Sequence, residues 1–316
     1  MAHPLHRRVV RRAFKLAGLR RWSHWEEGWP HLGLVRPEGG RAGAVLWRGR
    51  EVAALLPARR FAEAVGAEVV IVGSGPSLGG QDLAPVPPGA ALLLNGALRL
   101  APALAPHPGG RVLAGAVADE RFAWAGREAM REGLPRARLW LLSPPVLRVL
   151  LARDRDLLDR LAGDGGVILL DNLLRPWRAR RRRPGELGGA HVLRDGEAAL
   201  STDPDRGLAS CGTVAFEAMQ VALFARPRRI GLAGVDIAGA GRFYAEAAPE
   251  PSFLRDKERG IVAHFALAAR EAARRGIMVE CYSPASALLA VMPFSPRLRP
   301  DGLQATTTGV PTGTRS

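Results

Sequence analysis

The sequence predicts an α/β protein in which helices cover both faces of a mainly parallel, Rossmann-like sheet. From residue 67 onward, short apolar runs of strand type alternate with longer helical patterns, which is typical of parallel strands joined by crossover helices. The chain has 316 residues, 47% hydrophobic and 24% charged, which is enough for one large core. Two cysteines are too few for a disulfide-stabilised scaffold.

One main domain is expected at residues 67–295. Its strands are predicted at Glu68–Gly73, Ala91–Asn95, Arg111–Val117, Leu139–Leu142, Val167–Asp171, Arg229–Val235 and Ile277–Tyr282. Its helices are predicted at Glu120–Glu132, Pro145–Leu161, Gly212–Phe224 and Phe253–Arg275. Residues 1–66 form a basic, tryptophan-containing appendage in this interpretation. Residues 296–316, rich in Pro, Thr and Gly, form a flexible tail.

The cysteines and the N-terminus favour a cytoplasmic location. Cys211 and Cys281 form no CxxC pair, so a cysteine metal cluster is excluded and a reducing compartment is the default. No apolar run of signal-peptide or membrane-spanning length follows the N-terminal charges. We therefore expect neither export nor a membrane span.

The positive charge is concentrated in two short segments. Residues 1–21 hold seven Lys or Arg, and residues 175–183 hold six Arg, with no acidic residue in either. Removing these thirteen charges from the formal +15 leaves +2 for the rest of the chain. Because the body is nearly neutral, nucleic acid is not expected as a partner.

Each basic segment has two interpretations. Residues 1–25 can form a basic amphipathic helix that contacts anionic lipid peripherally at the inner membrane, or an arm that is solvated or packed on the body. The Arg-rich insertion at 175–190 carries too many charges to be buried. It either binds phosphate groups near the site or is a solvated insertion.

The sharpest local feature is VVIVGSGPSLGG, in which an apolar strand runs into Gly73, Ser74, Gly75 and Ser77. After a first strand of an α/β sheet, small residues let main-chain N–H groups approach a phosphate. Leu78 replaces the third glycine of the dinucleotide fingerprint, and the Lys-Ser/Thr of a P-loop is missing. The segment predicts a nucleotide-binding loop, with a structural turn as the alternative.

Polar residues also follow the next two strands. Asn95 ends the second strand, where its amide would reach a ribose or a base, unless Asn-Gly simply forms a turn. Asp119 follows the third strand and would bind a ribose hydroxyl or cap the helix that begins there.

A third block lies between residues 206 and 244. It contains a helix start made of the small or polar residues Ser210, Cys211, Gly212 and Thr213. Farther along, Asp236 follows a buried strand, and Tyr244 lies in a Gly-rich loop. Glu217 and Gln220 lie inside the apolar helix and receive no role.

Taken in order, these blocks resemble the bacterial sialyltransferases of glycosyltransferase family 42. The resemblance rests on GSGPSL after a first strand, a strand ending in Asn, the small-residue helix start, GVDIAGAGRFY and GIMVECYSPASALLA. It covers about residues 67–292 and leaves out the N-terminal arm, the Arg-rich insertion and the tail. Motility-associated-factor and MptE-like domains share the glycine motif and the GVD strand.

The resemblance implies a Rossmann-like fold of the GT-A-variant type and a metal-independent, inverting glycosyltransferase. Such an enzyme takes an acidic sugar from a CMP-sugar donor, without a cofactor, to a glycan or glycolipid acceptor such as lipopolysaccharide or capsule. The implied contacts are Gly73, Ser74 and Ser77 with the CMP phosphate, Asn95 with the ribose or cytosine, and Ser210 to Thr213 with the nucleotide. Arg206 would lie near the phosphate, and Tyr244 would help it leave.

Two positions depart from the family pattern. The second family tyrosine is Ala238 here, and the general-base histidine aligns near Arg259, which cannot accept a proton at neutral pH. Other residues could serve as the base, namely His264, Asp236, Glu258 and, more remotely, His191.

Two alternatives stay open. An MptE-like pterin diphosphokinase would need ATP and a metal held by carboxylates, for which Asp119, Glu120 and Asp236 are available without a persuasive spacing. A catalytically inactive nucleotide-binding relative would explain the missing histidine.

Overall fold

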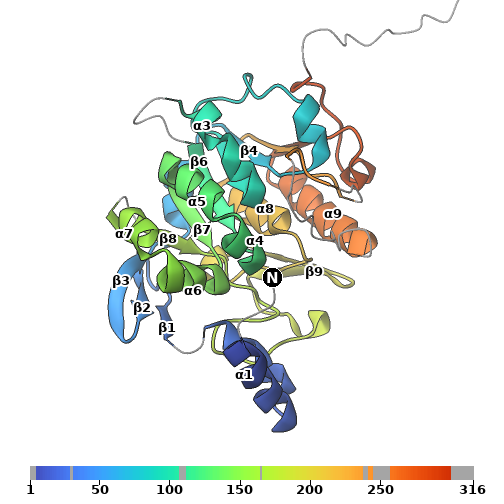
Figure 1. Ribbon diagram of the computed structural model, residues 1–316. Coiled ribbons are helices and arrows are strands. Elements are labelled where there is room, and N and C mark those ends of the chain that lie inside the picture. The colour runs from blue at the N-terminus through green and yellow to red at the C-terminus, as the bar shows by residue number, and fades with distance from the viewer. Residues whose placement is uncertain are drawn as a thin grey trace, which may run out of the picture.

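The structure is a computed structural model that describes residues 5–28, 31–106, 112–163, 166–237, 241–244 and 257–299. Figure 1 shows the fold of the chain. Within the described residues one ten-stranded sheet runs in the order β1-β2-β3-β8-β7-β6-β5-β4-β11-β12. Its strands are β1 Leu32–Val35, β2 Gly43–Trp47, β3 Arg50–Leu55, β4 Glu68–Val72, β5 Ala91–Leu94, β6 Val112–Val117, β7 Ala137–Leu142, β8 Val167–Leu169, β11 Arg229–Ala233 and β12 Met278–Cys281. A separate antiparallel hairpin pairs β9 Val192–Asp195 with β10 Ala198–Ser201.

The centre of the sheet is parallel, as the sequence predicts. The seven strands from β8 to β12 in the sheet order pair in parallel, and each corresponds to a predicted strand within a few residues. Both faces are buried: along β4, Val69 and Ile71 enter one apolar core, whereas Val70 and Val72 enter the other. A strand buried on both faces reads as a continuous apolar run, which is why these strands are visible in the sequence.

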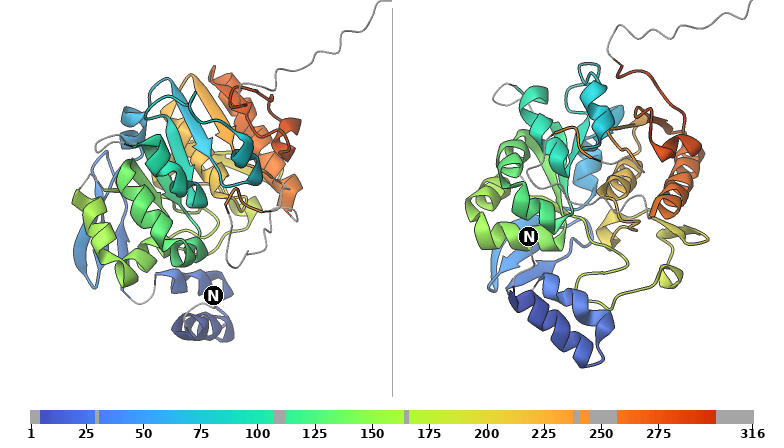
Figure 2. Two further views of the ribbon diagram at one scale, coloured as in Figure 1. Left: turned by 45° about the horizontal axis from the view of Figure 1, so that its top comes forward. Right: turned by 45° about the vertical axis from the view of Figure 1, so that its right-hand side comes forward.

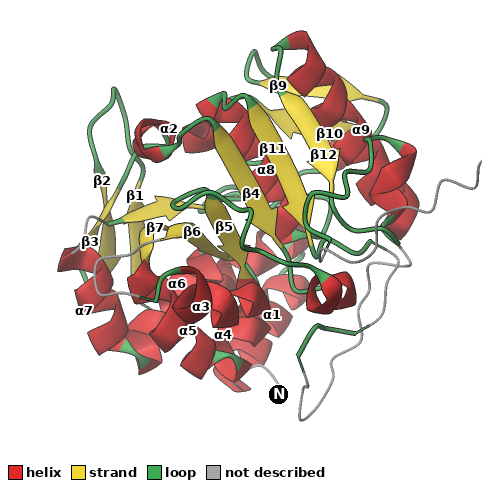
Figure 3. Ribbon diagram, turned by 90° about the horizontal axis from the view of Figure 1, so that it is seen from above, coloured by secondary structure: helices red, strands yellow, loops and turns green. Residues whose placement is uncertain are grey.

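Helices cover both faces, which confirms the predicted fold class (Figures 2 and 3). One face is covered by α2 Arg59–Ala64, α8 Val214–Ala225 and α9 Glu258–Arg274. The other is covered by α3 Ala101–Leu104, α4 Glu120–Ala125, α5 Arg127–Gly133, α6 Pro144–Arg153 and α7 Arg155–Gly163. No described helix is both long and apolar enough to cross a bilayer.

Two predicted helices are each broken into two. The helix expected over Glu120–Glu132 is interrupted at Gly126, where a Cβ would collide with the Phe122 ring. The helix expected over Pro145–Leu161 breaks at Asp154, whose backbone leaves helical geometry and whose carboxylate is held by arginines of α5. Tertiary contacts therefore override a helical pattern that is continuous in the sequence.

The sheet also extends beyond the predicted boundaries of the main domain. Strands β1 to β3 were not predicted, yet β3 pairs in parallel with β8 through Leu55 and Val167. The predicted boundary at residue 67 therefore falls inside the sheet. The elements that precede the sheet in the chain are α1 Leu5–Leu16 and the 3-10 helix η1 Arg20–Glu27. At the other end, Leu298 is buried and its carbonyl accepts from the Asp82 N–H at 2.8 Å. The predicted tail is thus packed through residue 299, and residues 300–316 lie outside the described residues.

Candidate functional site

The strand order of the sheet reverses at β4. From there β5, β6, β7 and β8 follow on one side, and β11 and β12 follow on the other. The loops after β4 and β11 therefore leave the sheet side by side at the carboxyl ends of their strands. Open α/β sheets bind ligands at such a reversal. A cavity of about 400 Å³ lies there, within the size range of small-molecule sites.

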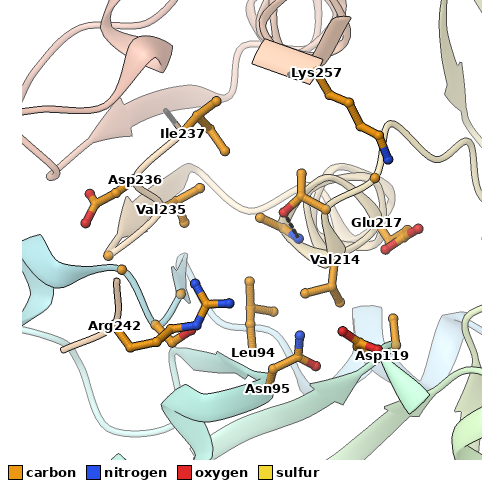
Figure 4. Close-up of a pocket in the computed structure, with 18 of the residues that line it drawn as sticks. Leu94, Asn95, Asp119, Val214, Glu217, Val235, Asp236, Ile237, Arg242 and Lys257 are labelled. Atoms are coloured by element: carbon orange, nitrogen blue, oxygen red, sulfur yellow. Dashed lines mark hydrogen bonds between the residues drawn. The ribbon is translucent and has the colours of Figure 1, made fainter. Parts of the chain in front are cut away.

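Nine of the predicted site residues line this cavity (Figure 4). They are Gly73, Ser74, Gly75, Asn95, Asp119, Ser210, Gly212, Thr213 and Asp236. They come from the loops after β4, β5, β6 and β11 and from the start of α8. The structure therefore places the glycine loop and the helix start, far apart in the sequence, around one space.

The glycines of the loop after β4 allow it to approach the loop after β11 closely. A Cβ at Gly73 would collide with the carbonyl oxygen of Gly234, and a Cβ at Gly75 with the Asp236 carboxylate. The Gly73 N–H donates to Ala233 O and the Gly75 N–H to Gly234 O, each at 2.8 Å. The expectation that these N–H groups are free to hold a phosphate is wrong, because protein carbonyls already accept from them.

Asp236 and Ser77 hold the same loop together. The Ser77 N–H donates to Asp236 Oδ2 and the Ser77 hydroxyl to Oδ1, both at 2.7 Å. Asp236 is buried, with 8% of its surface exposed. Both donors of Ser77 are therefore engaged by Asp236, which braces the loop with both of its carboxylate oxygens.

Asn95 lies in the cavity with an unsatisfied acceptor. Its φ of 44° places it in the left-handed region, which asparagine tolerates better than most residues. Its Oδ1 is buried and has no hydrogen-bond partner among the described residues. A buried polar atom without a partner is unfavourable, so this oxygen is suited to accept from an N–H or O–H group of a ligand.

The Asp119 side chain caps the helix that begins after it. As the N-cap of α4, it accepts from the Arg121 N–H at 2.9 Å and from Arg121 Nη2 at 3.1 Å. The helix-capping alternative is confirmed for Asp119. Its carboxylate lines the cavity but is already paired with the Arg121 guanidinium.

The start of α8 forms the opposite wall. Thr213 is the N-cap, and its hydroxyl accepts from the Ala215 N–H at 3.3 Å. Gly212 has a φ of 96°, which favours glycine, and the Lys257 side chain packs against it. Cys211 does not line the cavity, and burial raises the pKa of its thiol, which keeps it protonated.

Glu217 is a cavity residue that the sequence did not reveal. It lies in the first turns of α8 and is 9% exposed. Burial raises its pKa to about 7, an effect that a hydrogen bond from the Ser210 side chain partly offsets. A carboxyl group that titrates near neutrality is suited to take up or release a proton.

Besides Arg121, which pairs with Asp119, two further cations and an amide line the cavity without having been predicted. Arg242 follows β11, and Lys257 precedes α9, on opposite sides of the space in Figure 4. Asn172 lies shortly after β8, as Asn95 lies after β5. The rule that found Asn95, a polar residue at a strand's carboxyl end, would also have found Asn172. Lys257 is one of only two lysines in the chain, which is a weaker signal.

Three predicted catalytic residues lie outside the cavity lining. Arg206 is exposed in a short 3-10 helix. Tyr244 packs over Gly96, with Phe243 edge-on at 5.0 Å and the Arg99 guanidinium 4.8 Å from its ring centroid.

His264 is a packed helix residue. Its Nδ1 lies 2.7 Å from Gly260 O, and its ring meets Phe216 edge-on at 5.2 Å. Burial lowers its pKa. It does not line the cavity, so the structure gives no support to His264 as the base.

The remaining candidates give no better base. Glu258 and His191 do not line the cavity. Ala238 lies outside the described residues. Among the residues that the structure describes, no group of three or more His, Cys, Asp or Glu is placed to hold a metal ion.

Comparisons with known proteins give weak similarities. No family model and no curated protein match the chain. Among solved structures, the monofunctional α-2,3-sialyltransferase Cst-I from Campylobacter jejuni matches at 13% identity and a TM-score of 0.40, over 74% of this chain and 82% of that chain. The sialyltransferase CstII from the same organism, solved with CMP-3FNeuAc, matches at 13% identity and a TM-score of 0.39, over 74% and 88%. Similarity at this level establishes no family for the chain.

Proposed function

We propose that the protein is an inverting glycosyltransferase that moves an acidic sugar from a CMP-sugar donor to a surface-glycan acceptor. The proposal starts from the ordered sequence motifs that resemble family 42. The observation that carries it is that two of these motifs line one cavity at the reversal of the sheet, one through Gly73–Gly75 and the other through Ser210, Gly212 and Thr213. That position is where α/β folds bind nucleotides.

The polar lining of the cavity suits an anionic nucleotide. Arg242 and Lys257 provide positive charge from two sides, and the unsatisfied Asn95 Oδ1 provides an acceptor. We assign the donor's phosphate to the two cations and the sugar or base edge of the nucleotide to Asn95. In this assignment Arg242 and Lys257 also stabilise the charge on CMP as it leaves, in place of Arg206 and Tyr244.

We assign the proton transfer to Glu217. Inverting transfer needs a base within hydrogen-bond reach of the acceptor hydroxyl. Asp119 and Asp236 are already engaged by Arg121 and Ser77, whereas Glu217 is held by a serine hydroxyl and has a pKa near 7. In the reaction, its carboxylate takes the acceptor's O–H proton, the acceptor oxygen bonds to the anomeric carbon, and the bond to CMP breaks.

The proposal also includes the acceptor substrate and the cellular location of the reaction. A lipid-linked glycan, such as a lipopolysaccharide precursor at the cytoplasmic face of the inner membrane, would be reached through the basic N-terminal residues. No cofactor and no metal enter the proposed reaction, in which Arg242 and Lys257 carry the positive charge.

A thermal-shift screen with CMP, CDP, ATP and NAD, each with and without Mg²⁺, tests the nucleotide. A ligand at a hundred times its Kd stabilises the folded state by about 2.7 kcal/mol, which is easily measured. Stabilisation by CMP without Mg²⁺ supports the proposal. Stabilisation by ATP only with Mg²⁺ overturns it in favour of the diphosphokinase alternative.

Activity is tested separately with CMP-sugars. Release of CMP from a donor, accelerated by a glycan acceptor, supports transfer. Binding of CMP with neither hydrolysis nor transfer of any acidic CMP-sugar would identify a nucleotide-binding relative without activity.

A further inference from the structure

The two basic segments of the chain lie side by side, although about 160 residues separate them. The Arg181 N–H donates to Arg21 O at 2.7 Å, and Arg21 Nε donates back to Arg181 O at 2.8 Å. Trp25 Nε1 donates to Ala179 O at 3.1 Å, and Trp177 packs against Gly28. Figure 2 shows α1 and η1 next to the yellow-green segment that follows β8. We call residues 5–27 and 175–187 together the basic platform.

The platform is strongly and unevenly charged. It contains thirteen Lys or Arg and three Glu. Glu186 pairs with Arg21, and Glu27 lies 3.8 Å from Arg175. Burial and the nearby charges of Arg175 and Arg11 lower the pKa of Arg181. Cations this crowded repel one another, so an anionic surface that lies against them is stabilising.

Most cations of the platform point outward. On the N-terminal side, Arg12, Lys15 and Arg20 are exposed. On the insertion, Arg175, Arg178, Arg180, Arg181 and Arg183 are exposed. The Arg-rich insertion is therefore neither buried nor a separate loop, because its main chain is fixed to η1 while its guanidinium groups remain accessible.

Large apolar side chains are exposed among these cations. Leu16 is 84% exposed, Val9 64% and Leu19 46%. Val9, Arg12, Ala13 and Leu16 are spaced i, i+3, i+4 and i+7, so they share the outward face of α1. A nucleic-acid-binding surface needs the cations, but exposed leucine and valine side chains do not contribute to binding the phosphate backbone. A helix that lies in a lipid interface needs both.

We propose that the basic platform is a docking surface for an anionic phospholipid membrane. The outward face of α1 enters the headgroup region, and the arginines of the insertion bind lipid phosphates beside it. Two weak signals, one apolar and one electrostatic, together give stable peripheral binding where either alone does not. This inference does not depend on the proposed sugar transfer.

The platform also adjoins the cavity. The Arg175 N–H donates to Asn172 O at 2.9 Å, and Asn172 lines the cavity. Asp171, which directly precedes Asn172, is buried. It accepts from the Trp177 N–H at 3.1 Å and pairs with Arg36. The insertion of the platform therefore begins three residues after a residue of the cavity lining.

Co-sedimentation of the full chain with vesicles tests the proposal. We expect binding to vesicles of phosphatidylcholine with 30% phosphatidylglycerol, and much weaker binding to pure phosphatidylcholine. Arg178→Gln with Arg180→Gln should weaken binding by about 25-fold, at roughly fivefold per arginine. The matched control, Arg138→Gln with Arg228→Gln, removes two exposed arginines outside the platform, at the amino ends of β7 and β11. It should change binding less than twofold.

The apolar contribution is tested by Leu16→Gln, which should weaken vesicle binding about tenfold. Met278→Gln, at a residue 50% exposed on β12, is its control and should have no effect. Circular dichroism confirms that each variant is folded. Equal binding to neutral and anionic vesicles, or an unchanged affinity in both platform variants, overturns the proposal. Binding of duplex DNA or RNA in preference to anionic vesicles also overturns it, in favour of a nucleic-acid surface.

Discussion

Two buried carboxylates in the helical layers are each held by two arginines, whereas Glu217, a buried carboxyl in the cavity wall, is not. Asp154 accepts from Arg131 at 2.6 Å and from Arg127 at 2.8 Å, and Glu271 accepts from Arg275 at 2.6 Å and Arg274 at 2.7 Å. These hydrogen bonds lower the pKa of each carboxyl to about 2. Glu217, in the cavity wall, has a pKa raised to about 7 by burial.

The difference separates stability from chemistry. A carboxylate with a depressed pKa contributes stability at neutral pH, whereas one with a raised pKa reduces it. Asp154 stabilises the junction of α6 and α7, and Glu271 stabilises the end of α9. Burial of the Glu217 carboxyl destabilises the folded state at neutral pH, and packing alone does not explain why it is retained. Such destabilising burial of an ionisable group is common at reactive sites.

The largest effect is expected on turnover. Glu217→Gln removes the proposed proton acceptor and should reduce sugar transfer by roughly 10²- to 10⁴-fold, because the amide cannot take the acceptor's proton. CMP affinity should remain within threefold. The measurements are steady-state transfer rates and calorimetric CMP titrations. Glu128→Gln, on the exposed face of α5, is the control and should leave both unchanged. A Glu217→Gln enzyme with normal turnover would remove Glu217 from the mechanism.

The same substitution should stabilise the fold. Between pH 4.5 and about 7, the unfolded state ionises Glu217 while the folded state keeps it protonated, so stability falls with rising pH. Glu217→Gln removes this loss and should raise the free energy of unfolding at pH 8 by up to about 3 kcal/mol. At pH 4 the gain should vanish. Urea unfolding at both pH values measures it, and a gain of equal size at pH 4 and pH 8 would show that titration is not its cause.

Asp154→Asn should act in the opposite direction. Because the pKa of Asp154 is depressed in the folded state, its contribution is complete above pH 4 and is lost as the pH falls towards 2. The substitution should lower the free energy of unfolding at pH 7 by about 2 kcal/mol and leave activity per folded molecule unchanged. If stability at pH 7 is unaffected, the arginines of α5 do not hold this carboxylate in solution.

The smallest effect is expected at Lys257, a cation of the cavity lining. Lys257→Met keeps the aliphatic packing against Gly212 and removes the charge, so CMP affinity should fall about tenfold. The loss should shrink as salt is added. Lys15→Met, the other lysine of the chain and exposed on α1, should leave CMP affinity unchanged in the absence of vesicles. Equal affinities for the two variants would place the phosphate away from Lys257.

Much of the fold can be predicted from the sequence, for a physical reason. A parallel strand buried on both faces is a continuous apolar run, as in Ala91–Leu94. The strands β1 to β3 do not form such a continuous apolar run, because they are partly exposed. The breaks at Gly126 and Asp154 depend on the Phe122 ring and on arginines of α5, which no local pattern reveals.

The site is predictable only where a residue ends a strand or starts a helix. Gly73, Asn95 and Ser210 were found because topology alone brings such positions together. Glu217 was missed because the face that a helix turns towards a cavity depends on how the helix packs. His264 was misplaced for the same reason, since the sequence does not show that its ring packs against Phe216.

Calorimetric titration of CMP into the wild-type chain and into Asn95→Ala, without metal, tests the nucleotide cavity most directly. One CMP per chain is expected, bound more tightly than AMP, with about a tenfold loss in the variant as the hydrogen bond to Oδ1 disappears. No heat of binding, or a CMP affinity that Asn95→Ala leaves unchanged, would contradict the assignment of this cavity to a cytidine nucleotide.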